Sequence, residues 1–284
     1  GDNNTAMGVS ALYTNNADNN TAFGRSALSA NTTGTRNVAV GTYSLDANTT
    51  ANDNTAVGYN AATAITTGVS NTAIGATALG TLTTGSRNAA LGYMALQLQT
   101  GASDNVGIGN FAGGAVTTGD YNTLVGSLAG DGITTASSLT AFGYRALSAP
   151  SCTGANNTAV GKDAMLSNTT GSENTAVGTA ALDANTTGVS NVALGRASLG
   201  ANTTGSSNIA VGEAAMNANT TGGNNTAVGG NALTANTTAS NNTGIGKDAL
   251  KANTTGAENV AVGSAALDAI TDAEANTAVG YQAL

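Results

Sequence analysis

Hydrophobic and polar positions recur along the chain with a period of 17 residues. Residues 174–190 read NTAVGTAALDANTTGVS, and residues 191–207 read NVALGRASLGANTTGSS, which repeats the same order of polar and apolar positions. A corner glycine closes each NTAVG-like segment, and two intervals between these glycines differ from 17 residues, one being 16 and one 18. A unit of this length is too short for a helical hairpin and suits one coil of a β-solenoid. The pattern predicts an all-β chain of about 17 stacked coils.

Each repeat predicts a first strand, a corner, a second strand and a turn. The five residues of NTAVG form the first strand, and a segment such as TAALDA is expected to form a second, more irregular one. NTTG returns the chain, because glycine and asparagine adopt turn conformations easily. A glycine at one corner of every coil, such as Gly178, indicates a positive φ angle or a place without room for a side chain.

Three apolar ladders, each formed by one position in successive coils, run along the chain. The residue before the corner glycine is always apolar, as at Val177, and the residue before that is alanine except at Gly107, Leu124 and Gly244. A third ladder lies four residues after the glycine, as at Leu182. Neither face of the first strand has the polar positions of a solvated face. We therefore expect one face to pack inside its own coil and the other against neighbouring chains of a homo-oligomer.

Asparagine opens every repeat except the one that begins at Leu139. These residues, among them Asn174, predict a stacked ladder of side-chain amides, with contact to a ligand as the alternative. A second asparagine ladder lies in NTT, and it predicts a half-buried corner because apolar residues replace it at Ile65, Leu82, Val116, Ile133 and Ile270. NTT and segments such as Asn3-Asn4-Thr5 also match the glycosylation sequon.

The NTAVG-x-x-AL unit resembles the head repeats of trimeric autotransporter adhesins, the YadA-like left-handed β-roll. Arrays that read NTAVGYQAL, as at residues 276–284, are similar to the shaft repeats of phage tail fibres. This resemblance implies left-handed coils in a parallel homotrimeric fibre at a cell surface or on a virion. Its partner would be a cell-surface glycan or protein receptor. No individual binding residue is carried over, and the 17-residue unit is longer than the common adhesin head repeat.

Composition and charge argue against most chemistry. The chain has no histidine, its charged content is 8%, and its net charge is −8 with only eight basic residues, which are scattered. We expect no nucleic-acid partner, because no phosphate-tracking stripe can form, and no membrane insertion, because no apolar segment reaches 18 residues. A single cysteine, Cys152, excludes an intrachain disulfide and is expected to be a turn residue. We expect no catalytic site, no cofactor and no metal, and hence no enzyme.

Variation along the array marks positions that face outward. The residue after the corner glycine changes freely, and the tyrosines there, Tyr59, Tyr93 and Tyr144, are candidate surface contacts that either stack on sugars or reflect β-propensity. Aspartates five residues after the glycine are expected to be solvated: Asp46, Asp131, Asp183 and Asp268. Residues 97–154 are the most irregular, with Gly113 and Gly130 in the leucine ladder. We expect Phe111 and Leu128 to move inward there, with a ligand site as the alternative.

The sequence favours a single repetitive domain, residues 1–284, that is a fragment of a longer fibre protein. The predicted function is an extracellular adhesin or tail-fibre shaft that rigidly presents a host-binding or surface-binding region. Two alternatives stay open. One is a self-assembling extracellular filament, and the other is an ice-binding solenoid that uses threonine rows such as Thr32-Thr33 and Thr186-Thr187.

Overall fold

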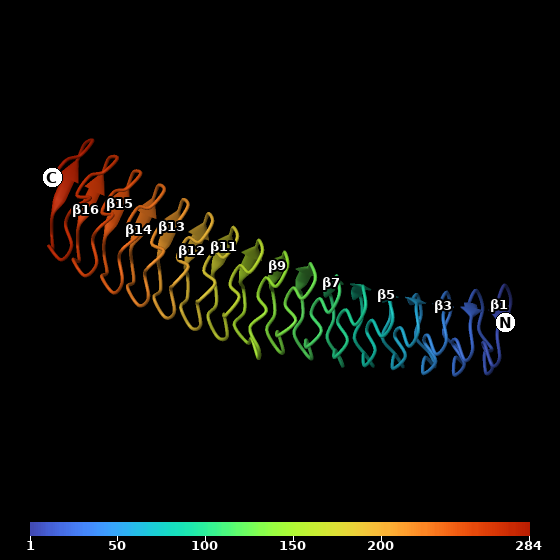
Figure 1. Cartoon of the computed structure of the whole chain (residues 1–284). Helices are drawn as coiled ribbons and strands as arrows, with labels where there is room; N and C mark the ends of the chain where they lie inside the picture. Colours follow the sequence, from blue (N-terminus) through green and yellow to red (C-terminus); the bar gives the residue numbers. More distant parts are fainter. The chain divides into compact units, whose positions relative to one another are not determined.

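The computed structural model describes all 284 residues, and every regular element in it is a three-residue β-strand. The chain is an all-β parallel β-solenoid that contains no helix. It divides into two compact units, Gly1–Leu139 and Thr140–Leu284, and each unit is a stack of 17-residue coils (Figure 1). The prediction of a single domain stays a prediction from the repeat.

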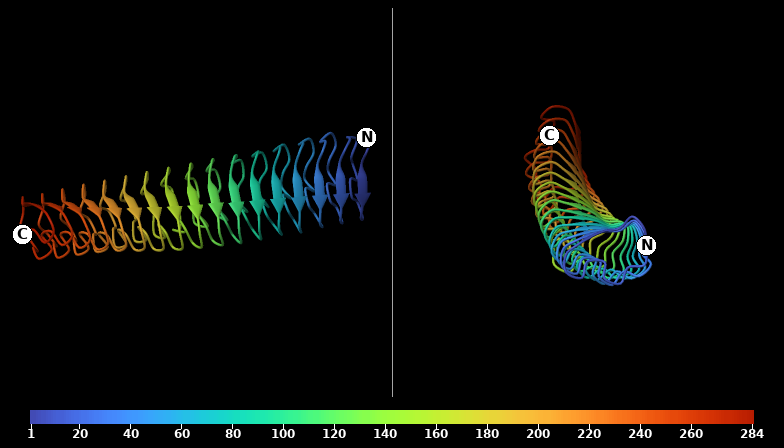
Figure 2. Two further views of the ribbon diagram at one scale, coloured as in Figure 1. Left: turned by 90° about the horizontal axis from the view of Figure 1, so that it is seen from above. Right: turned by 90° about the vertical axis from the view of Figure 1, so that its right-hand side faces the viewer.

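The strands of each unit form one parallel sheet with one strand from every coil. Neighbouring strands pair in register, so that Ala176 faces Ala193 one coil later. Figure 2 shows this alignment of successive strands from two further directions. The first unit contains β1 (Thr5–Met7), β2 (Thr21–Phe23), β3 (Val38–Val40), β4 (Thr55–Val57), β5 (Thr72–Ile74), β6 (Ala89–Leu91), β7 (Val106–Ile108) and β8 (Thr123–Val125). The second contains β9 (Thr140–Phe142), β10 (Thr158–Val160), β11 (Thr175–Val177), β12 (Val192–Leu194), β13 (Ile209–Val211), β14 (Thr226–Val228), β15 (Thr243–Ile245), β16 (Val260–Val262) and β17 (Thr277–Val279).

The predicted second strand is wrong. Residues 179–184 form consecutive turns, because Ala180 and Leu182 have φ angles of 53° and 54°. These angles lie in the left-handed region, which an extended strand cannot contain. The segment is nevertheless tied to its neighbours, since the backbone N–H of Leu182 donates to Ser198 O at 3.0 Å. The coil is therefore one short strand followed by a chain of turns that are hydrogen-bonded from coil to coil.

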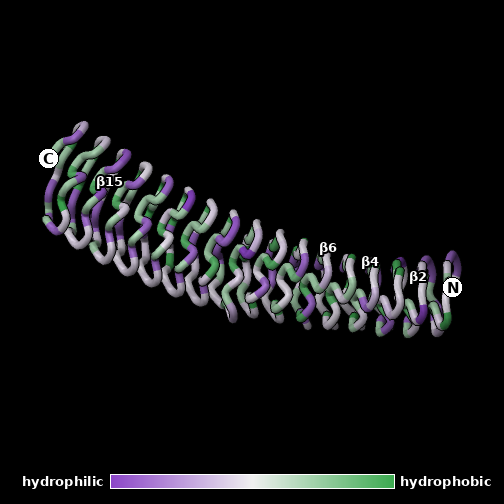
Figure 3. Tube along the Cα trace, in the orientation of Figure 1, coloured by the Kyte–Doolittle hydropathy of each residue, from purple (hydrophilic) through white to green (hydrophobic).

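The interior of the coil is thin and made of small side chains. Ala176 in the middle of β11, Ala181 and Leu182 have no exposed surface. The same positions are buried through most of both units, and polar and apolar segments recur around each coil (Figure 3). The alanine ladder and the leucine ladder thus form the core of each unit.

The corner glycine has both properties that the sequence indicated as alternatives. Gly178 has a φ angle of 138°. A Cβ atom added to it would lie 2.5 Å from Gly195 O and 2.6 Å from Gly195 C in the next coil. A side chain is excluded by the backbone conformation and by the close stacking of the coils.

Packing near Gly113 and Gly130 differs from the expected inward shift of Phe111 and Leu128. Phe111 and Leu128 remain half-buried. Leu124 of β8 stands where most coils have alanine and fills the space instead, because a Cβ at Gly113 would lie 2.7 Å from its Cδ1. A Cβ at Gly130 would lie 2.8 Å from its Cδ2. The two glycines and the one large residue are therefore a matched set.

Candidate functional site

The outward strand face is the most extensive exposed apolar feature of each unit. We define it as the first and third residues of each strand, which point away from the interior while the middle residue is buried. At the third position Val177 is 38% exposed. The exposed large side chains at this position are Met7, Phe23, Ile74, Leu91, Ile108, Phe142, Val177, Ile245 and Val279.

No strand carries a charged residue on this face. The first position holds threonine, valine, isoleucine or alanine, and the third holds only apolar residues. Of the two apolar faces in the sequence pattern, the alanine side packs inside its own coil. The valine side is uncovered within the chain. Clustering of exposed apolar side chains without charge is typical of an interaction surface.

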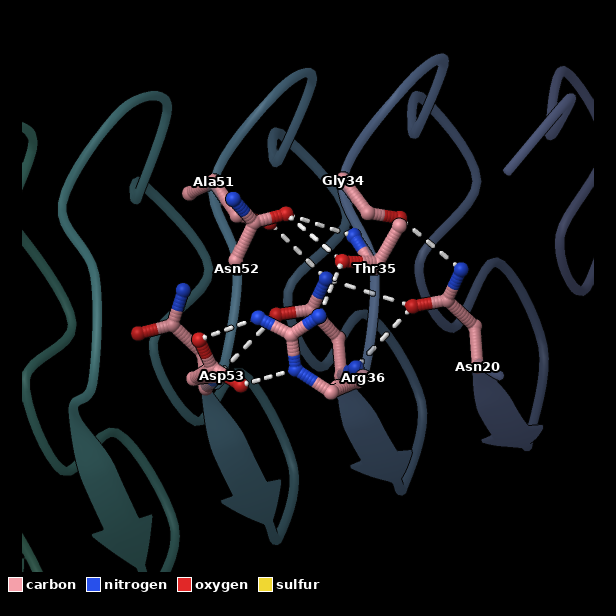
Figure 4. A network of polar contacts seen from close by, with 9 residues as sticks. Asn20, Gly34, Thr35, Arg36, Ala51, Asn52 and Asp53 are labelled. Carbon is pink, nitrogen blue, oxygen red and sulfur yellow. Dashed lines mark hydrogen bonds and ion pairs between the residues drawn. The ribbon is translucent and has the colours of Figure 1, made fainter. Parts of the chain in front are cut away.

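The first asparagine ladder lies inside the coil and serves the backbone. Asn174 is fully buried, its Oδ1 accepts from the Asn191 N–H at 2.9 Å, and its Nδ2 donates to Gly188 O at 2.9 Å. Figure 4 shows the same arrangement at Asn20, whose Nδ2 donates to Gly34 O at 2.8 Å. These amides are satisfied by the protein itself, and their burial closes them to a ligand.

The second asparagine ladder is fully buried rather than half-buried. Asn185 has no exposed surface, and its Nδ2 donates to Asn168 Oδ1 at 2.8 Å. Ile65, at the same position in another coil, is buried equally well. The corner faces the interior, so either an amide that bonds its neighbour or an aliphatic side chain fits it. The NTT sequons therefore carry inaccessible asparagines.

The three tyrosines singled out in the sequence are all exposed, but they do not form one site. Tyr59 is 55% exposed, and Tyr93 and Tyr144 are each 46% exposed. Tyr59 and Tyr93 belong to the first unit, and Tyr93 contacts Phe111 edge to face with ring centroids 5.5 Å apart. Tyr144 belongs to the second unit, where the Arg145 guanidinium lies 6.0 Å from its ring centroid.

Two ion pairs between successive coils were not predicted from the sequence. Arg36 binds Asp53 through both carboxylate oxygens, at 2.6 Å from Nε and 2.8 Å from Nη2 (Figure 4). Arg87 and Asp104 repeat this geometry at 2.6 and 2.7 Å. The hydrogen bond from each arginine lowers the pKa of its aspartate partner. The available signal was an arginine and an aspartate spaced by one period. Both pairs are exposed and belong to the coil stacking.

The remaining candidates offer no arrangement for catalysis. The structure has no pocket and no cluster of three metal-ligating side chains. Cys152 is buried, and burial raises the pKa of its thiol. Asp183 is half-buried rather than solvated, and its burial together with the charge of Asp163 raises its pKa. No helix capable of crossing a membrane occurs in the fold.

Comparison with models of known protein families gives no match for this chain. Comparison with curated protein sequences gives none either.

Proposed function

We propose that the outward strand face of this chain is covered by other copies of the chain, and that the resulting homotrimer is the shaft of an extracellular fibre. The observation that carries this proposal is the uncharged, uncovered strand face, which contrasts with the 24 charged residues elsewhere in the chain. The number of three chains, their left-handed coils and their location on a cell surface or virion come from the resemblance to adhesin and tail-fibre repeats.

Energetics favour such an assembly because the contact repeats with every coil. Complete burial of an aliphatic side chain is worth roughly 1.5–3 kcal/mol, and a half-exposed one contributes a fraction of that value. A parallel, in-register partner would add this fraction at each of the nine strands β9–β17 in the second unit. Charges that interrupted the face would oppose this burial, and none is present.

In this proposal the chain performs no catalysis and serves host or surface attachment. A regular stack whose coils are joined by backbone hydrogen bonds presents its surface residues at fixed positions. Its partners are two further copies of the chain and a glycan or protein receptor on the target surface. Neither nucleic acid nor insertion into a membrane by this segment is part of the proposal.

The ice-binding alternative is less well supported because its threonine rows are not free. In each NTT segment the first threonine is occupied by stacking, as the Thr186 hydroxyl donates to Thr203 O at 3.1 Å. The Thr32 hydroxyl donates to Thr49 O at 2.9 Å in the same way. The outward strand face also mixes valine with larger residues such as Phe23 and Phe142, so it lacks the regularity that a lattice match requires.

Size-exclusion chromatography with light scattering tests the proposal. We expect a mass three times the 27.2 kDa of one chain. A double variant, Val177→Lys with Leu194→Lys, places two charges on the outward strand face and is expected to dissociate the particle while the circular dichroism spectrum stays unchanged. Thr179→Lys, which adds a charge at an exposed corner position, is the matched control and is expected to keep the native mass.

Two outcomes would contradict the homotrimer. A monodisperse monomer of the native chain would leave the outward strand face without its proposed partner and would favour the ice-binding alternative. Particles whose mass grows with protein concentration would instead favour the self-assembling filament.

A further inference from the structure

One corner of the first unit combines aromatic rings with uncharged polar groups. The two residues that follow each corner glycine contain no charge from Thr42 to Leu128. The aromatic corner, as we name it, consists of Tyr59, Tyr93, Met94, Phe111 and Leu128. The equivalent positions of the second unit instead carry Arg145, Lys162, Asp163, Arg196, Glu213, Lys247 and Asp248. This difference is not required by the repeat, because both units build the same coil from the same ladders.

The two exposed tyrosines of this corner are held at a fixed separation. They occupy the same position two coils apart, which places them about 9.6 Å apart along the stack at about 4.8 Å per coil. The backbone N–H of Phe111 donates to Tyr93 O at 2.9 Å, and the Phe111 ring packs against the Tyr93 ring. The position of Tyr93 is therefore fixed by its neighbours before any ligand arrives.

We propose that the aromatic corner binds an extended, neutral, β-linked oligosaccharide. A tyrosine ring with a free face packs against the C–H face of a sugar ring, and its hydroxyl remains available for a hydrogen bond. Asn60 follows Tyr59 in the chain, and Asn110 lies one coil beyond Tyr93, so each ring has an amide nearby. The absence of charge suits a neutral ligand, and the straight two-coil separation is close to the length of one disaccharide in an extended chain.

A protein partner fits this corner less well. Aromatic residues that dominate protein interfaces cluster in well-packed, desolvated pockets, and this surface has no pocket. Tyr59 and Tyr93 also lie at a corner beside the outward strand face rather than within it. The inference rests on the proposed attachment function for its setting, and it names the class of partner that the fibre would hold.

Titration calorimetry with defined hexasaccharides tests the inference on the full chain. We expect chitohexaose or cellohexaose, both β-1,4-linked and neutral, to bind at least tenfold more tightly than α-linked maltohexaose or a charged hexagalacturonate. Tyrosine fluorescence provides a second readout, because the chain has seven tyrosines and no tryptophan. Tyr93→Ala and Tyr59→Ala should each weaken binding about tenfold. Tyr144→Ala, the matched change in the charged corner of the second unit, should leave it unaltered.

The outcomes separate this inference from the proposed function. If neither β-linked hexasaccharide binds, or if both tyrosine variants of the first unit bind as tightly as the native chain, the oligosaccharide site is wrong even when the particle is a trimer. If the native chain is a monomer that binds chitohexaose through Tyr93, the oligosaccharide site stands and the homotrimer is wrong.

Discussion

The side-chain oxygen of Asn174 accepts a hydrogen bond from the backbone N–H of Asn191, one coil further along, at 2.9 Å. Both residues are fully buried. Asn174→Ala removes this acceptor and leaves the Asn191 N–H unpaired in the interior, whereas Gly188 O keeps a second donor in Asn185 Nδ2. An unpaired buried polar group costs roughly 1–3 kcal/mol, so we expect the free energy of unfolding to fall by about 2 kcal/mol. Urea unfolding followed by circular dichroism measures the change.

Asn217→Ala is the control for this substitution, because Asn217 is exposed and its φ angle is not positive. It should change the free energy of unfolding by less than about 0.5 kcal/mol. Equal effects of the two substitutions would contradict a stabilising role for the buried ladder.

Close stacking of the coils makes Gly178 more sensitive to substitution than Gly280. Both have unusual φ angles, 138° and 131°, and an alanine at either position is strained by about 1–3 kcal/mol. A Cβ at Gly178 would also meet Gly195 O at 2.5 Å, whereas the nearest atom to a Cβ at Gly280 is Ala283 Cβ at 3.8 Å. We expect Gly178→Ala to cost a further 1–3 kcal/mol or more in urea unfolding, because overpacking adds roughly this much. Similar losses for the two variants would show that backbone conformation alone requires the glycine.

The period, the corner glycines and the inward alanines were predictable from the sequence, because each is a position that recurs with little change. Ala176 and Leu182 lie in the core as their ladders indicated, and Gly178 lies at a corner. The exposure of the valine ladder followed from counting more apolar ladders than the interior holds. Regular repetition exposes such features since each coil must satisfy the same packing.

The conformation after the corner glycine could not be predicted from residue type. Ala180 and Leu182 adopt left-handed φ angles, although such residues do so rarely outside glycine, asparagine and aspartate. Hydrogen bonds between coils determine this backbone, and a pattern of apolar residues does not encode them. The role of Leu124 was missed for a related reason, because its fit with Gly113 and Gly130 depends on contacts between separate coils.

Gln99 is a buried residue whose replacement should stabilise the fold. Its side chain has no exposed surface, and neither Nε2 nor Oε1 has a hydrogen-bond partner. Leu82 and Val116, one coil before and one coil after, occupy the same inward position. We expect Gln99→Leu to raise the free energy of unfolding by about 1–3 kcal/mol, since it removes two unpaired buried groups. Thermal and urea unfolding measure the gain, and Gln97→Leu, at a half-buried position, is the control. A loss of stability in Gln99→Leu would contradict this account.

Asp183 gives the stability of the second unit a defined pH dependence. Burial, with a further contribution from the charge of Asp163, raises the pKa of Asp183 above the ordinary value of 3.8. The folded state therefore binds this proton more tightly than the unfolded state does. Stability from this group is present below pH 3.8 and is lost as the pH rises through the raised pKa of the folded protein.

Asp183→Asn should remove this loss, and Asn217, two coils further along, already occupies the equivalent position. We expect the variant to be more stable than the native chain at pH 7, whereas the difference should vanish below pH 3.8, where both side chains are neutral. Urea unfolding from pH 3 to pH 7 measures the difference. Glu274→Gln, at an exposed position, removes one negative charge from a chain of net charge −8 and thus controls for general repulsion. If the two variants gained equally at pH 7, the effect would belong to net charge, and burial of Asp183 would not be its cause.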